Sequence, residues 1–166
     1  MQIIRFIKHI FSAPWRVGLV FPTRSLKAIE SAIAASETLH LGELRFVVES
    51  ALETGQLWRA VSSRQRAIEV FSECRVWDTE YNSGVLIYLL LADRHVEIVA
   101  DRGIHDKVGE NVWADICRAM EERFRSGEFE RGVLEGIAAI TIQLKQHFPA
   151  GHAENPNEIA NAPIIL

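Results

Sequence analysis

Five oxygen-bearing side chains lie around two short apolar segments of the sequence, and their chemistry is that of a site for a hard cation. They are Asp78, Glu80, Asn82, Asp101 and Asp106. Ca²⁺ binds several carboxylate, amide and carbonyl oxygens, whereas zinc prefers nitrogen and sulfur ligands. The five residues are therefore candidate metal ligands, with Ca²⁺ as the candidate cofactor. Caps and turns also use Asp and Asn, so the alternative is a purely structural role.

Two predicted strands bring these residues to one edge of a sheet. Residues 85–91 are apolar throughout and follow Asn-Ser-Gly, which is typical of a central strand covered on both faces. Residues 95–100 alternate between apolar and polar, which predicts a hairpin partner. The start of a strand and the end of its hairpin partner lie at the same edge. We therefore expect the loop with Asp78 to meet the loop with Asp101.

A further strand is predicted over residues 43–49, because Leu44, Phe46 and Val48 alternate with other residues. Arg45 and Glu49 on the opposite face predict a strand that is half buried or near an edge. A single helix separates it from the central strand, so the two should be parallel with a right-handed crossover. The predicted fold class is α/β, a small mixed β-sheet with a parallel crossover and an antiparallel hairpin, sandwiched between helices.

Four helical patterns surround these strands. Apolar spacings of three and four residues predict helices over 23–42, 108–125 and 129–147. Ser62 and Gln65 form a capping box that opens another helix. In the last helix two glycines four residues apart, at 132 and 136, predict close helix packing.

Length and charge predict one domain with two flanking segments. The chain has 166 residues, the usual size of one domain, and its net charge of -4 argues against nucleic acid as a partner. The boundaries are a basic amphipathic N-terminal segment at 1–22, a domain at 23–149 and a disordered tail at 150–166. The pattern predicts no signal peptide or transmembrane helix. The expected location is the cytoplasm or the inner face of the membrane.

The N-terminal segment has two alternative roles. The first acidic residue is Glu30, so this end is basic although the whole chain is acidic. Apolar residues between 3 and 11 share one helical face. Such a helix either makes a peripheral membrane contact through residues 1–20 or docks on the apolar surface of its own domain.

Well-known catalytic machineries are missing from the sequence. It contains no G-x-S-x-G elbow, P-loop, dinucleotide glycine pattern or H-E-x-x-H pair. Cys74 and Cys117 stand at apolar helical positions, which favours packing. His95 at the start of a strand favours a surface role over general-base catalysis. Arg94 and Arg102 fall at opposite ends of a predicted strand, so they cannot converge on a phosphoryl group.

Several segments, in order and spacing, resemble the TPM domain family. They are Gly42-Glu43-Leu44, the helix at 65–75, the stretch NSGVLIYLLLADR at 82–94, VEIVADRGI at 96–104 and the pattern M-x-x-x-F-x-x-G-x-F-x-x-G at 120–132. The resemblance covers about residues 24–148. The chain looks like the short, free-standing bacterial members. It departs from the family in having Asn-Ser-Gly for Asn-Asn-Gly, and Asp101 where glycine or an aromatic is common.

The resemblance implies calcium binding, weak acid phosphatase activity or an accessory role in membrane complexes, each known for some members. We expect a non-catalytic accessory or interaction domain that binds Ca²⁺, has a protein partner and acts near a membrane complex. The alternatives are a weak metal-dependent acid phosphatase and a structural subunit of a membrane-associated assembly. The missing nucleophile favours the first.

Overall fold

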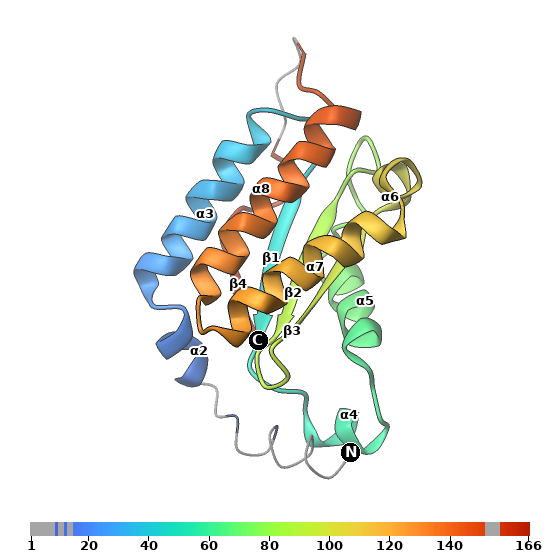
Figure 1. Ribbon diagram of the computed structural model, residues 1–166. Coiled ribbons are helices and arrows are strands. Elements are labelled where there is room, and N and C mark those ends of the chain that lie inside the picture. Colours follow the sequence, from blue (N-terminus) through green and yellow to red (C-terminus); the bar gives the residue numbers. More distant parts are fainter. Residues whose placement is uncertain (1–8, 10–11, 13–14, 152–156) are drawn as a thin grey trace.

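A four-stranded mixed sheet forms the middle of the computed structural model, which describes residues 9, 12, 15–151 and 157–166 (Figure 1). Its strand order is β3-β2-β1-β4. The strands are β1 (Leu44–Glu49), β2 (Val85–Leu90), β3 (His95–Ala100) and β4 (Ile164–Ile165). β1 is parallel to both β2 and β4, and β2 is antiparallel to β3. The predicted α/β class with a parallel crossover and a hairpin is confirmed, whereas the fourth strand was not predicted.

Seven helices are described, and most follow the predicted patterns. They are α2 (Trp15–Val20), α3 (Thr23–Glu37), α4 (Thr54–Trp58), α5 (Ser63–Glu73), α6 (Arg102–Val108), α7 (Glu110–Arg125) and α8 (Phe129–His147). The capping box before α5 is confirmed, because the Ser62 hydroxyl accepts the Gln65 N–H. The helix predicted over 108–125 begins later, at Glu110, because Gly109 with φ of 83° separates it from α6.

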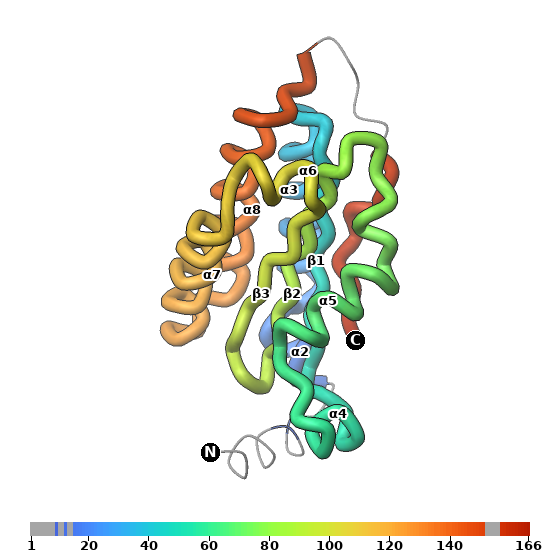
Figure 2. Tube along the Cα trace, turned by 90° about the vertical axis from the view of Figure 1, so that its right-hand side faces the viewer, coloured from blue at the N-terminus to red at the C-terminus, as the bar shows by residue number. Residues whose placement is uncertain are grey.

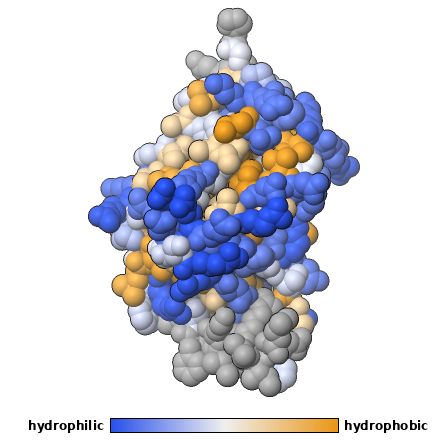
Figure 3. Space-filling view, in the orientation of Figure 1, coloured by the Kyte–Doolittle hydropathy of each residue, from blue (hydrophilic) through white to orange (hydrophobic). Residues whose placement is uncertain are grey.

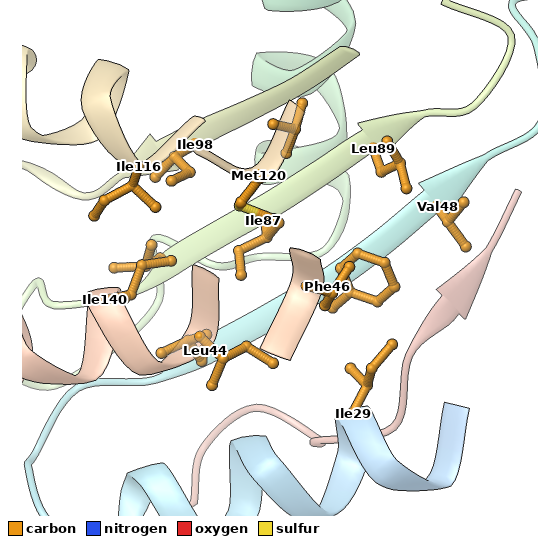
Figure 4. Close-up of a cluster of buried hydrophobic side chains, with 14 of the residues drawn as sticks. Ile29, Leu44, Phe46, Val48, Ile87, Leu89, Ile98, Ile116, Met120 and Ile140 are labelled. Atoms are coloured by element: carbon orange, nitrogen blue, oxygen red, sulfur yellow. The ribbon is translucent and has the colours of Figure 1, made fainter. Parts of the chain in front are cut away.

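The sheet is covered on both faces, which explains the uninterrupted apolar run of β2. Side chains of a strand alternate between faces. Leu86, Tyr88 and Leu90 pack with α5, while Ile87 and Leu89 pack with α3, α7 and α8. Figure 4 shows the second cluster, and Figure 2 shows α5 and α7 on opposite sides of the sheet. A strand covered in this way has no position for a polar side chain that lacks a partner.

The two glycines of α8 allow the close packing that their spacing predicts. A Cβ atom on Gly132 would overlap the Phe124 ring, and one on Gly136 would overlap the Met120 side chain. Both neighbours belong to α7. The close contact of α7 and α8 holds the helical layer against β2 and β3.

The predicted disordered tail at 150–166 needs correction over its last ten residues. Residues 157–166 lie along the side of β1 that faces away from β2, where Ile164 and Ile165 pair with Val47 and Val48. Residues 152–156 lie outside the described residues. An uncovered edge strand would expose unpaired N–H and C=O groups, and this segment satisfies some of those of β1. The polar composition of the segment concealed its few apolar anchors.

Most of the N-terminal segment lies outside the described residues, but His9 and Ser12 are described and both are buried. The Leu52 N–H donates to His9 Nδ1 over 2.9 Å, and His9 Nε2 lies 3.2 Å from the Asp93 carboxylate. At these residues the segment contacts its own domain. No helix in the described ranges is long and apolar enough to cross a membrane.

Candidate functional site

The edge of the sheet where β2 begins and β3 ends brings Asn82 and Asp101 together; we call it the rim. The Asp101 N–H donates to the Gly84 carbonyl over 2.8 Å. Asp101 also caps α6, because its Oδ1 accepts the Arg102 N–H over 2.6 Å. The carbonyls of Tyr81 and Asn82 lie so close to the start of α6 that a Cβ on residue 103 would overlap them, which requires glycine there.

One carboxylate oxygen at the rim has no donor. Asp101 Oδ2 is buried and accepts no hydrogen bond from any residue that the structure describes. Removing a carboxylate oxygen from water without a partner is costly, unless a cation or a proton compensates. The Tyr81 and Asn82 carbonyls, which lie against Gly103 two residues further along the chain, are further oxygen atoms at the rim. This donor set fits Ca²⁺, which accepts carbonyls and waters beside carboxylates, and does not fit zinc.

The other three predicted ligands are exposed. The Asp78 N–H donates to the Arg75 carbonyl over 3.0 Å, and its side chain lines a pocket with Arg45. The Glu80 N–H donates to the Glu158 carboxylate over 3.1 Å. Asp106 lies on α6. No three His, Cys, Asp or Glu side chains of the described part form a group that could hold a metal, so the five-ligand site stays a prediction.

The opposite edge contains a buried polar cluster that sequence reasoning missed. The Tyr88 hydroxyl donates to Glu49 Oε2 over 2.6 Å, and Arg66 Nε donates to the same oxygen over 3.0 Å. Burial, reinforced by Glu49, holds the pKa of Tyr88 above its usual range. The phenol therefore remains a donor, and the cluster neutralises Glu49 inside the fold. The only sequence signal was an acidic residue at the end of an apolar strand.

A second buried cluster lies between α3 and β1. Burial raises the pKa of Glu37 to about 8, although the Leu44 N–H opposes this, and nearby Glu43 reinforces it. Burial lowers the pKa of His40 to about 4. Glu37 accepts the Leu44 N–H over 2.9 Å, so it fixes the chain where β1 begins. These residues show no distinctive spacing in the sequence, apart from the Gly-Glu-Leu motif of the resemblance.

The nucleophile and base candidates named from the sequence, His95, Cys74 and Cys117, have shifted pKa values. A hydrogen bond from His95 to Glu97 raises the pKa of His95 against the effect of burial, and Glu121 adds to the rise. The two ring nitrogens of His95 lie 3.0 Å from Glu97 and beside Glu121, respectively, so both are already engaged by carboxylates. Burial raises the pKa of Cys117 to about 12 and also raises the pKa of Cys74, so neither thiol forms a ready thiolate.

Comparison with known proteins agrees with this architecture. The TPM domain model matches residues 20–143. The NMR structure of BA42 protein from the psychrophilic bacterium Bizionia argentinensis is 28% identical, with a TM-score of 0.77, covering 88% of this chain and 95% of that one. The N-terminal domain of a protein from P. gingivalis, also solved by NMR, is 18% identical, with a TM-score of 0.62 and coverage of 78% and 79%. No curated protein matches the chain.

Proposed function

The chain belongs to the TPM domain family, and we propose that within it this protein is a non-catalytic interaction domain that binds Ca²⁺ at the rim and acts near a membrane complex. The observation that carries the proposal is the buried Asp101 Oδ2, which lacks a hydrogen-bond donor among the described residues. The Tyr81 and Asn82 carbonyls, of a kind that a hard cation also binds, lie against Gly103 at the start of α6. Bound Ca²⁺ would supply the missing positive charge and tie the loop before β2 to the start of α6.

We favour binding over turnover because the sequence contains none of the familiar nucleophile motifs and no arginine pair converges on the rim among the described residues. Stabilising a phosphoryl group in transfer takes metals or arginines aimed at one point. Arg94 precedes β3 and Arg102 follows it, so the length of the strand separates them. Burial raises the pKa of both thiols, and the nitrogens of His95 are engaged by Glu97 and Glu121. Among the residues considered, the phosphatase alternative therefore depends on Asp101 at the rim.

A calcium titration with a thermal-unfolding readout tests this proposal. A ligand at ten times its Kd stabilises the fold by about 1.4 kcal/mol, which raises Tm by a few degrees. We expect this rise in wild type and its loss in Asp101→Asn, since asparagine still caps α6. The matched control is Asp115→Asn, because Asp115 is exposed on α7 and far from the rim in sequence. No rise at millimolar Ca²⁺ would rule out the site.

The same two variants separate binding from catalysis. Aryl phosphate turnover that needs Ca²⁺ and disappears in Asp101→Asn would replace the interaction role with the phosphatase alternative. Turnover that both variants retain would not come from the rim. We expect none above background.

Two exposed aromatic sites support action near a membrane. Trp15 and Leu19 on α2 are 67% and 71% exposed, with Arg16 between them, and Trp58 on α4 is 77% exposed. Figure 3 shows a mixed face, with one hydrophobic area over α2 at the lower left and others in the upper half. Tryptophan beside a basic residue suits the interface of an anionic bilayer.

Co-sedimentation with liposomes tests this part of the proposal. We expect wild type to pellet with anionic vesicles, and a Trp15→Ser, Leu19→Ser double variant to remain in the supernatant. An Ile142→Ser variant is the matched control, since Ile142 is an exposed apolar residue on α8. Equal pelleting of all three proteins would contradict membrane contact through α2.

A further inference from the structure

We propose that the free side of β1 is a binding groove for an extended segment of a partner protein, and that residues 157–166 of this chain fill it when the partner is absent. We call these residues the tail and the surface beneath them the tail groove. The inference rests on the proposed interaction role and names its surface. The fitting partner segment has the pattern of the tail itself. It carries an acidic residue and then an aliphatic one, as at Glu158 and Ile159, and two further aliphatic residues at the positions of Ile164 and Ile165.

The groove recognises main-chain groups of the tail. Glu43 Oε2 accepts the Ile159 N–H over 3.1 Å, and Arg45 donates to the Ala160 carbonyl. Further along, the Leu166 N–H donates to the Val48 carbonyl over 3.0 Å. Any extended segment offers the same main-chain groups. This is how strand addition at a sheet edge gains affinity, while side-chain pockets supply specificity.

One side chain of the tail gives the groove its selectivity. Ile159 is 8% exposed and packs in the cluster under α5, with Val47, Val70 and Val76 among its members. The preceding Glu158 carboxylate accepts the Glu80 N–H. An acidic residue followed by an aliphatic one is therefore the pair that this end of the groove selects.

The tail leaves part of the groove unused. A cavity of about 330 Å³ remains beside Ile159, and it is also lined by Arg45, Cys74 and Arg75. Arg45 Nε is buried and finds no acceptor among the residues of the described ranges. A glutamate in place of Ala160 would extend into this space and bring a carboxylate to the Arg45 guanidinium. The groove thus fits a partner better than it fits the tail.

The tail is also weakly held compared with the rest of the sheet. β4 pairs only two residues with β1, whereas six residues of β1 pair with β2. The large core under α3, α7 and α8 contains no tail residue, and the TPM domain match ends at residue 143, before the tail. Displacing the tail therefore leaves most of the core intact.

Peptide exchange on the full chain tests the groove. Residues 152–156 are replaced by a site for a sequence-specific protease, so that the tail is cut only after folding. The probe is a fluorescent peptide with the sequence of residues 157–166, and binding is followed by fluorescence polarisation. We expect the cut chain to bind it at least ten times more tightly than the uncut chain. An Ile159→Asp peptide should bind at least ten times more weakly than the probe.

Two further peptides test the commitment to a separate partner. An Ala160→Glu peptide should bind more tightly than the tail sequence, by threefold or more, and an Ala160→Gln peptide of matched size should not. Failure of the cut chain to bind the probe, or equal binding of the Ile159→Asp peptide, would overturn the groove. Equal affinity of all residue-160 peptides, or dimers of the uncut chain formed by tail exchange, would overturn the separate partner. None of these results depends on Ca²⁺, so the rim proposal stands or falls separately.

Discussion

Glu37 should make the protein less stable as the pH rises from about 6.5 to 8. The side chain is buried, and burial raises its pKa from 4.5 to about 8, with Glu43 adding to the rise and the Leu44 N–H opposing it. The folded protein then keeps a proton that the unfolded chain has released. Wherever the folded state binds more protons than the unfolded state, the free energy of unfolding falls with increasing pH.

The size of the effect follows from the width of the pH range. Each pH unit changes the free energy of unfolding by about 1.4 kcal/mol per extra bound proton, so a loss of about 2 kcal/mol is expected between pH 6.5 and 8. Below pH 6.5 the two states also differ at His40, whose pKa burial lowers from 6.5 to about 4. Its neutral form stabilises the fold, so that contribution is lost as the pH falls.

Urea unfolding of Glu37→Gln at several pH values measures the effect. Glutamine keeps an oxygen for the Leu44 N–H but cannot ionise, so the variant should lose about 2 kcal/mol less than wild type over the same range. Glu135→Gln is the control, since hydrogen bonds from Arg123 and then Arg131 lower the pKa of exposed Glu135. It should retain the wild-type slope. The same slope in wild type and Glu37→Gln would refute the reasoning.

Three other substitutions probe the fold. Gly84→Ala should cost about 2–3 kcal/mol in chemical denaturation, because its Cβ would overlap the Val76 carbonyl, and an unchanged stability would contradict this contact. Tyr88→Phe should cost about 1–3 kcal/mol by removing a donor from buried Glu49, and a neutral result would show that the hydrogen bond contributes little. His95→Gln should lower Tm at pH 5.5 but not at pH 9. The pKa of His95 is raised in the folded state, so the protonated histidine stabilises the fold at low pH. This contribution is lost as the pH rises through the folded-state pKa. An equal loss at both pH values would contradict it.

Two of these substitutions have matched controls. A Cβ on Gly18 would meet nothing within 4 Å, so Gly18→Ala should not destabilise the protein. Tyr81 is exposed, so Tyr81→Phe should leave stability unchanged. Losses of similar size in these controls would show that the effects are not specific to the buried positions.

The elements predicted from sequence are those whose own residues determine them. β2 is apolar throughout because it is covered on both faces, and the capping box of α5 is a local hydrogen-bond pattern. β1 was harder, since Arg45 and Glu49 indicated a half-exposed strand. Glu49 is buried with Arg66 and Tyr88, which come from other elements. A single strand gives no information about such distant partners.

The candidate site was predictable only in outline. The hairpin geometry predicted that the loop before β2 meets the end of β3, where the Asp101 N–H donates to the Gly84 carbonyl. It did not predict that Asp78 lines a pocket beside α5, because the course of an irregular loop depends on its packing. The tail was missed because strand pairing over two residues leaves almost no periodic pattern, and its binding surface lies more than a hundred residues earlier in the chain.

The central claim is that a stable domain carries a displaceable tail over β1. Amide hydrogen exchange of the uncut full chain tests this claim most directly. Exchange rates report local opening. Exchange is followed by mass spectrometry. The amide hydrogens of residues 157–166 should exchange on the order of 100 times faster than those of residues 85–90, because a weakly paired segment opens without global unfolding. If the tail exchanges as slowly as β2, it opens only when the whole domain unfolds, and the account is wrong.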